Sequence, residues 1–277
     1  MHLTLGHSPD PDDAFMFWAL ATDQFDTGGY TFEHILQDIQ TLNERAERGE
    51  LDITAISIHA YAHVHDKYAL LPTGSSMGDG YGPMLVAKQG SGLTVEDLKS
   101  KRIAVPGRMT TAYLAARLLL GDFDHDIVMF DEIPAKVASG EFEAGLLIHE
   151  GQLTYEADGL ELVQDLGVWW QDDTGLPLPL GGNAIRKSFG LERNREINRV
   201  LKKSIELGLE HRKVAVDHAM QFGRGLDTAT ADEFIGMYVN DWTLDYGDRG
   251  REAISLLLKR GADAGIVPPV DGVEFVD

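Results

Sequence analysis

The chain has 277 residues, 43% of them hydrophobic, which suffices for the cores of one large or two modest globular domains. Its 45 acidic and 24 basic residues give a net charge of −21, which would repel nucleic acid, and the absence of cysteine excludes disulfides, thiolate metal ligands and a cysteine nucleophile. No stretch approaches the roughly 18 apolar residues of a membrane span, and the first residues do not resemble a secretory signal, so we expect a cytoplasmic protein with no membrane partner.

The first part of the chain alternates strands and helices. A strand over 2–8 precedes a helix over 9–22, and a second strand over 30–36 precedes a helix over 39–50. Residues 51–64 then read as a strand that runs into a helix. This βαβα alternation predicts a mostly parallel sheet. A loop rich in glycine, TGSSMGDGYGP, leads to an apolar strand, MLVAK.

A second α/β unit begins near Gly90. It contains a helix and a strand over 93–107, a helix over 110–123 and an apolar strand that ends in IHEG. The segment DTGLPLPLGGNAIRK reads as a return strand, and the rest of the chain has helical spacing. We therefore expect a two-lobed α/β fold with a ligand cleft between the lobes. Lobe 1 would comprise 1–88 and 182–277, with the C-terminal helices packed on it, and lobe 2 would comprise 89–181.

Two segments are candidates for a ligand site. In VPGRMTTAYLA, Thr110 and Thr111 start a helix, where free N–H groups, the helix dipole and hydroxyls could bind a small anion. A threonine that only caps its own helix is an equally good interpretation. In AGLLIHEG, His149 follows a buried strand, where open α/β sheets bind ligands, and histidine can accept a proton at cellular pH. A lone histidine is nevertheless more often structural.

Other polar residues have weaker patterns. The aspartates Asp10, Asp12 and Asp13 lie at a helix start, so capping is favoured over a metal site. His59 and His63 are four residues apart but lack an HExxH motif, and we expect no metal there. Several serines near strand ends could donate to a ligand: Ser8, Ser57, Ser75 and Ser76. Aromatic rings that could stack on a ligand, although burial is commoner, are Tyr81, Trp169 and Trp170.

Five motifs in order resemble one known family. They are HSPDPDDAFMFWAL, SSMGDGYGPMLV, VPGRMTTAYLA, LLIHEGQLTY and GLPLPLGGNAI, and they span nearly the whole chain. Together they are similar to the 1,4-dihydroxy-6-naphthoate synthase (MqnD) family of menaquinone biosynthesis by the futalosine route. The resemblance implies a periplasmic-binding-protein-like (type II) fold. It also implies a cytoplasmic lyase that converts cyclic dehypoxanthine futalosine to 1,4-dihydroxy-6-naphthoate without a metal or organic cofactor.

The resemblance also implies roles for particular residues. His149 matches the family's proton-accepting histidine, and the family's substrate-binding segment matches Thr110, Thr111 and Ala112. Further expected substrate-binding residues are Ser57, Ser8, Asp13, Ser76 and Tyr81.

This chain departs from the family pattern in its opening motif. That motif often reads SPCPNDTF, whereas this chain has Asp10, Asp12 and Ala14 at three of its positions. Asp79 in the glycine loop is another added acid. Two alternatives remain open. One is the related enzyme of the same pathway that dehydrates chorismate, and the other is a non-catalytic cytosolic protein that binds a small anion. The sequence leaves the oligomeric state undecided.

Overall fold

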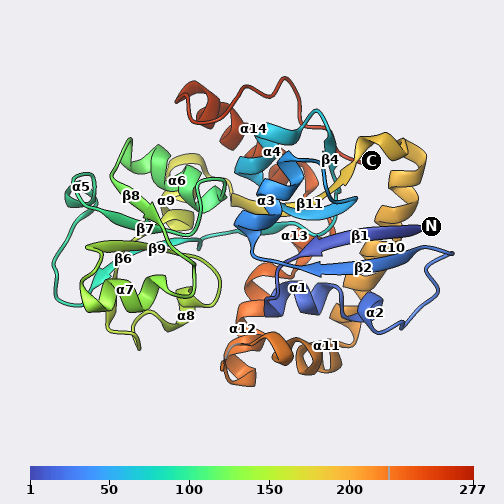
Figure 1. Cartoon of the computed structure of the whole chain (residues 1–277), viewed down its shortest axis with the longest axis horizontal. Coiled ribbons are helices and arrows are strands. Elements are labelled where there is room, and N and C mark those ends of the chain that lie inside the picture. The colour runs from blue at the N-terminus through green and yellow to red at the C-terminus, as the bar shows by residue number, and fades with distance from the viewer. Residues whose placement is uncertain (224) are drawn as a thin grey trace.

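The computed structural model describes residues 1–223 and 225–277. The chain forms two lobes, each built around its own sheet (Figure 1). The first sheet has six strands in the order β2-β1-β3-β11-β4, with β5 also paired to β11. Its strands are β1 (His2–His7), β2 (Thr31–Leu36), β3 (Ile53–Ser57), β4 (Tyr68–Leu70), β5 (Ser76–Gly78) and β11 (Leu178–Arg186).

The second sheet has five strands in the order β10-β6-β9-β7-β8. Its strands are β6 (Met84–Lys88), β7 (Ile103–Val105), β8 (His125–Ile127), β9 (Ala144–Leu147) and β10 (Leu160–Asp165). Each sheet contains three strands that pair in parallel, as the alternation of strands and helices predicts. β1 pairs with β2 and β3, and β7 pairs with β8 and β9.

The expectation of a mostly parallel sheet is wrong, because the strands that enter each sheet from the other lobe run antiparallel. β11 pairs antiparallel with β3, β4 and β5, and β6 pairs antiparallel with β9 and β10. The pairing also differs from the expected lobe limits at two places. Residues 84–88 belong to the second sheet, and β11 joins the first sheet from Leu178. The assignment of the remaining residues to lobes stays a prediction.

Helices connect and cover the sheets. The helix expected over 9–22 is interrupted at Phe17, which caps α1 and precedes α2. The helices before β11 are α1 (Pro11–Met16), α2 (Trp18–Ala21), α3 (Ile39–Glu47), α4 (Ile58–Val64), α5 (Val95–Leu98), α6 (Thr111–Leu120), α7 (Ile133–Ser139), α8 (Gly151–Thr154) and α9 (Leu166–Thr174).

The C-terminal part is helical, as expected, and packs on the first lobe. α10 contacts α2, α11 contacts α1, and α14 contacts β11 and α4 (Figure 1). These helices are α10 (Leu191–Glu210), α11 (Arg212–Ala219), α12 (Thr228–Tyr238), α13 (Asp241–Leu244) and α14 (Gly247–Asp263), with 3-10 turns at Lys187–Phe189 and Met220–Phe222. Across residues 1–223 and 225–277, none of the helices combines the length and the apolarity that crossing a membrane requires.

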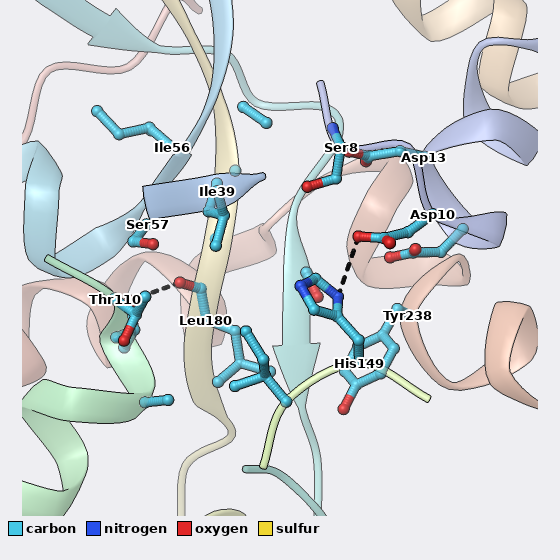
Figure 2. A pocket seen from close by; sticks show the side chains of 18 of the residues that line it. Ser8, Asp10, Asp13, Ile39, Ile56, Ser57, Thr110, His149, Leu180 and Tyr238 are labelled. Atoms are coloured by element: carbon cyan, nitrogen blue, oxygen red, sulfur yellow. Dashed lines mark hydrogen bonds and ion pairs between the residues drawn. The ribbon is translucent and has the colours of Figure 1, made fainter. Parts of the chain in front are cut away.

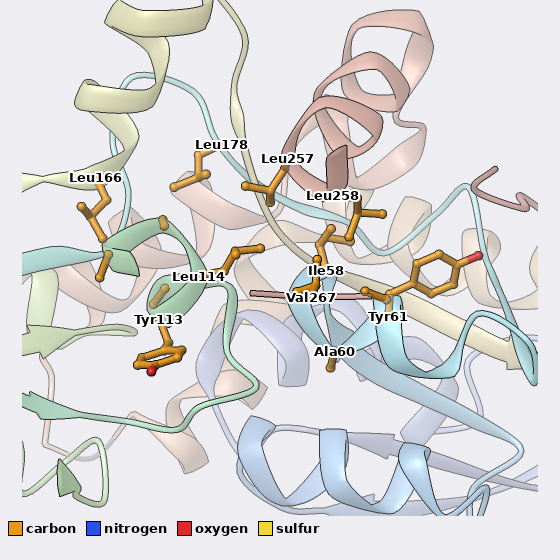
Figure 3. Packing of buried hydrophobic residues seen from close by; sticks show 14 of the residues in the cluster. Ile58, Ala60, Tyr61, Tyr113, Leu114, Leu166, Leu178, Leu257, Leu258 and Val267 are labelled. Carbon is orange, nitrogen blue, oxygen red and sulfur yellow. The ribbon is translucent and has the colours of Figure 1, made fainter. Parts of the chain in front are cut away.

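One apolar cluster joins the two lobes. It brings together Ile58 from α4, Leu114 from α6 and Leu257 from α14, all fully buried (Figure 3). Because α6 belongs to the second lobe while α4 and α14 pack on the first, this burial holds the lobes together along one side. Separate clusters fill the inside of each lobe.

The first connection between the lobes passes close to the start of α9 at two glycines. A Cβ atom on Gly167 would lie 1.9 Å from the carbonyl oxygen of Tyr81, and one on Gly82 would lie 2.8 Å from the Gly167 nitrogen. Only residues without a side chain fit at this approach. The glycine loop thus needs Gly82 for proximity, whereas Gly80, with φ +83°, supplies the left-handed turn that the sequence predicts.

Candidate functional site

A cavity of about 800 Å³, its open mouth included, lies between the lobes. Many of its lining residues follow the carboxyl ends of strands, where open α/β sheets bind ligands. Ser8 follows β1, Ser57 ends β3, and His149 follows β9. Within the described part of the chain, the lining includes neither lysine nor arginine. An anionic ligand here would therefore depend on N–H and O–H donors rather than on cationic side chains.

The structure brings most of the expected site residues to this cavity. Those that line it are Ser8, Asp13, Ser57, Ser76, Thr110, Thr111, Ala112 and His149. Figure 2 shows two groups that face each other, with Asp10, Asp13 and His149 on one side and Ser57 and Thr110 on the other. The cavity thus has an acid–base side and a donor side.

His149 has an unusual backbone. Its φ is +56°, in the left-handed region that residues other than glycine seldom adopt, and such positions are often found at functional sites. Its Nδ1 lies 3.2 Å from Oδ2 of Asp10, and its ring packs edge-on against Phe130 at 4.8 Å. Nε2 is buried and has no hydrogen-bond partner among the described residues. The imidazole is therefore held through one nitrogen while the other is available to a ligand.

The aspartate turn does not act as a simple helix cap. Asp10 occupies the N-cap position of α1, but its side chain makes no cap bond and instead points towards His149 (Figure 2). Asp13 accepts a hydrogen bond of 2.6 Å from the backbone N–H of Ser8. In the described part of the chain no group of three histidine or acidic side chains is arranged to hold a metal ion.

The neighbouring carboxyl groups favour their protonated forms. Burial, followed by the charge of Asp10, raises the pKa of Asp13 to about 7, although the Ser8 N–H opposes this shift. Asp12 is partly exposed on the cavity wall, where desolvation and then the charges of Asp13 and Asp10 raise its pKa well above the usual range. This turn consequently carries less negative charge than its sequence suggests.

The threonine hydroxyls at the start of α6 are engaged within the protein. Thr110 caps the helix by accepting from the Tyr113 N–H at 3.2 Å, and it donates to Gly107. Thr111 donates to the Leu180 carbonyl at 2.6 Å and accepts from the His59 N–H at 3.2 Å. The expected hydroxyl donors are therefore not free. The first-turn N–H groups of Thr111 and Ala112, which have no acceptor within an α-helix, remain as donors.

Ser57 is held by a residue that the sequence did not indicate. Asn43 of α3 accepts from the Ser57 N–H and donates to the Ser57 hydroxyl, both at 2.9 Å. Since Ser57 Oγ accepts this bond, its own hydrogen is left for a ligand in the cavity. The same Asn43 also donates to the Met109 carbonyl, so it ties α3 to the loop before α6.

Tyr238 and Gln152 add a contact across the cavity. The buried Tyr238 hydroxyl donates to Gln152 Oε1 at 2.6 Å, which joins α12 to α8. No local pattern marks either residue, since one lies in a helix rich in apolar residues and the other in a short turn. Together with the Asp10–His149 pair and the Thr111–Leu180 bond, this contact closes the lobes around the cavity.

Several other candidates lie away from the cavity lining. Tyr81 donates to the Met237 carbonyl, and its ring packs edge-on against that of Tyr238. Asp79 accepts a hydrogen bond from the side chain of Gln171. His59 bonds to the Thr110 carbonyl, and burial lowers the pKa of its imidazole to about 4. Ser75 donates to the Trp242 carbonyl, and the indole of Trp170 is fully buried.

Comparisons with known proteins cover nearly the whole chain. A family model described as menaquinone biosynthesis matches residues 3–263. A Thermus thermophilus protein named 1,4-dihydroxy-6-naphtoate synthase is 38% identical over 274 residues, which is 99% of each chain. A Streptomyces coelicolor protein of the same name is 36% identical over 272 residues, covering 96% of this chain and 95% of its own.

Solved structures agree with the two-lobed architecture. A protein from Archaeoglobus fulgidus superposes with a TM-score of 0.91 at 44% identity, covering 96% of this chain and 98% of its own. A Candida albicans protein, described as having the generic periplasmic binding protein fold, gives a TM-score of 0.72 at 12% identity, covering 98% and 92%. At that identity the likeness concerns the fold alone, and it confirms the expected periplasmic-binding-protein-like fold.

Proposed function

Since the chain belongs to the menaquinone biosynthesis family that includes the 1,4-dihydroxy-6-naphthoate synthases, we propose that it cleaves cyclic dehypoxanthine futalosine to 1,4-dihydroxy-6-naphthoate. Membership makes it an enzyme of that pathway. The observation that carries the more specific proposal is His149, whose ring lines the interlobe cavity and whose buried Nε2 has no hydrogen-bond partner among the described residues. A neutral imidazole nitrogen in this position can act as a general base.

The two sides of the cavity suggest how the substrate is oriented. The naphthoate carboxylate would meet the first-turn N–H groups of α6 and the Ser57 hydroxyl, where the helix dipole favours negative charge. The sugar-derived hydroxyls would then face His149 and the aspartate turn. Because the pKa values of Asp12 and Asp13 are raised, these carboxyls oppose an anionic substrate less than three ionised groups would.

The proposed chemistry is a retro-aldol cleavage begun by proton removal. Nε2 of His149 takes the proton of a substrate hydroxyl, and the O–H electron pair forms a carbonyl while the adjacent C–C bond breaks. The electrons of that bond move to the fragment that does not carry the new carbonyl, and this fragment takes up the proton that the imidazolium of His149 returns. General base catalysis contributes about 10²–10⁴-fold, and orientation in the closed cavity contributes more.

The test is incubation of the purified protein with cyclic dehypoxanthine futalosine, followed by mass spectrometry. We expect loss of substrate and appearance of 1,4-dihydroxy-6-naphthoate. A parallel incubation with chorismate should leave chorismate unchanged. Consumption of chorismate alone would favour the dehydratase of the same pathway, and ligand binding without product would favour a binding protein. Either result would overturn the proposal.

Thr111→Val should weaken catalysis through loss of an interlobe bond. The near-isosteric valine cannot donate to the Leu180 carbonyl or accept from His59, which costs about 1–2 kcal/mol. If closure depends on this bond, kcat/KM should fall roughly tenfold. Thr94→Val is the matched control, because Thr94 caps α5 outside the cavity lining. Equal kcat/KM values in the two variants would show that the Thr111 hydroxyl has no part in closure.

A further inference from the structure

We propose that Asp10 is the positioning residue for the base His149, and that the base is complete only when the two lobes are closed. This inference rests on the proposed function. The residues come from different lobes, since Asp10 precedes α1 in the first and His149 follows β9 in the second. Oδ2 of Asp10 lies 3.2 Å from Nδ1 of His149, so this contact joins the two lobes at one side of the cavity (Figure 2).

The burial of Asp10 suits this role. Its side chain is only 2% exposed, and it makes no cap bond to α1 even though it occupies the capping position. A buried carboxyl group is costly unless a hydrogen-bond donor or an opposite charge faces it. His149 provides both, because Nδ1–H can point at the carboxyl oxygen and because the imidazole becomes positive when it accepts a proton. Asp10 would thus stabilise the charge that forms during catalysis.

The contact also selects one tautomer of His149. With Asp10 at Nδ1, the proton of the neutral ring is favoured on Nδ1, which leaves the lone pair on Nε2. Nε2 is the nitrogen without a partner among the described residues. The left-handed backbone at His149 and the edge-on contact with Phe130 fix the ring in this orientation. A base with its lone pair in the cavity is the form that the reaction requires.

The neighbouring acids do not fill the same role. Asp13 accepts the Ser8 N–H, and its pKa is raised to about 7. Asp12 lines the cavity, but it makes no ion pair with His149 among the described contacts, and its pKa is also raised. Among the described residues, Asp10 contacts His149 directly, and the charge of Asp12 also interacts with it.

The link to closure follows from the interlobe geometry. Separation of the lobes on the cavity side would break the Asp10–His149 contact together with the Tyr238–Gln152 bond. In an open molecule His149 would lose its tautomeric preference and be exposed to water. Deprotonation of the substrate would then start only after the ligand is enclosed, which protects the reactive intermediates from side reactions.

The decisive variant is Asp10→Asn, which keeps the shape but removes the charge. We expect kcat to fall about 100-fold with KM changed less than threefold, because Asp10 acts through the base rather than on bound substrate. Asp10→Glu should restore part of kcat, and Asp12→Asn, the matched control, should lower kcat much less than Asp10→Asn.

A second readout does not depend on turnover. Nitrogen NMR of histidine-labelled protein, with His149→Gln to assign the signal, should show Nδ1 protonated in the neutral ring of the wild type and a mixture of tautomers in Asp10→Asn. An identical tautomer in both proteins would overturn the inference. Absence of naphthoate from the wild type would instead overturn the proposed function, and the NMR result would still report on the pair.

Discussion

Replacement of His149 by alanine is expected to lower kcat for naphthoate release by about 10³-fold, which is within the range that one general base contributes. The cause is local, because Nε2 of His149 is the basic atom in the cavity without a protein partner in the described residues. The other imidazoles near the turn are engaged, as His7 is bonded to Ser8 and His34. Substrate binding should persist, because the donors at Ser57 and at the start of α6 are unchanged.

The left-handed backbone at position 149 calls for a second variant. Alanine is strained at φ +56°, whereas asparagine tolerates this region and still cannot act as a base. His149→Asn should therefore fold as well as the wild type and show the same loss of kcat. His2→Ala is the matched control, since His2 lies at the opposite end of β1 with 66% of its side chain exposed. Turnover near the wild-type rate in a folded His149→Asn protein would eliminate the assignment.

The location of the site could be predicted from the sequence because strand ends are local features. Ser57 and His149 each follow a short apolar run, and Thr110 follows a strand and a glycine. The parallel strands of each sheet end at one edge, and both edges border the cavity, so these residues from the two lobes meet there. The resemblance of five motifs added the family, which the comparisons confirm.

The detailed contacts could not be predicted, because they join distant parts of the chain. Asp10 and His149 are far apart in the sequence and belong to different lobes, and Tyr238 and Gln152 meet only once α12 has folded over the cavity. Asp10 is interpreted from its sequence as a helix cap, a local role that the contact with His149 overrides. For the threonines, a hydroxyl at a helix start indicates a possible donor but not which carbonyl takes its hydrogen.

The antiparallel pairs could not be predicted either, because they too depend on connections between distant parts of the chain. Alternation of strands and helices predicts parallel pairing only for strands joined by a crossover within one lobe. β6 and β11 arrive from the other lobe, and β10 follows the short helix α8, so their direction is set by the connections between lobes. The direction of these strands depends on the two-lobed topology, which the local periodicity of the sequence does not reveal.

Acid should destabilise the protein through His7, which is buried beside the aspartate turn. Desolvation, and then the neighbouring His34, lower the pKa of His7 to about 3, so the folded protein keeps the ring neutral. In the unfolded chain a histidine titrates near 6.5, and below that pH the unfolded state binds a proton that the folded state does not. The stability that His7 contributes is thus complete above pH 6.5 and is lost as the pH falls towards 3.

The magnitude follows from the width of that window. At pH 4.5, about two units below the unfolded value, His7 alone should cost the folded state about 3 kcal/mol. The His7→Gln variant isolates this contribution, since glutamine can donate to the Ser8 carbonyl and accept from His34 but does not titrate. Urea unfolding of both proteins at pH 7 and pH 4.5 should give a loss of stability that is larger in the wild type by about 3 kcal/mol.

Comparison of the two proteins removes the other titrations from this measurement. His59, with its pKa lowered to about 4, adds a loss of the same sign, whereas Asp13, with its pKa raised to about 7, gains stability as the pH falls. Both groups are present in the wild type and in His7→Gln, so their contributions cancel in the difference. Parallel pH profiles for the two proteins would mean that His7 binds its proton equally well in the folded and the unfolded state. In that case the bonds from His7 to Ser8 and His34 would need a different proton arrangement from the one that keeps the ring neutral.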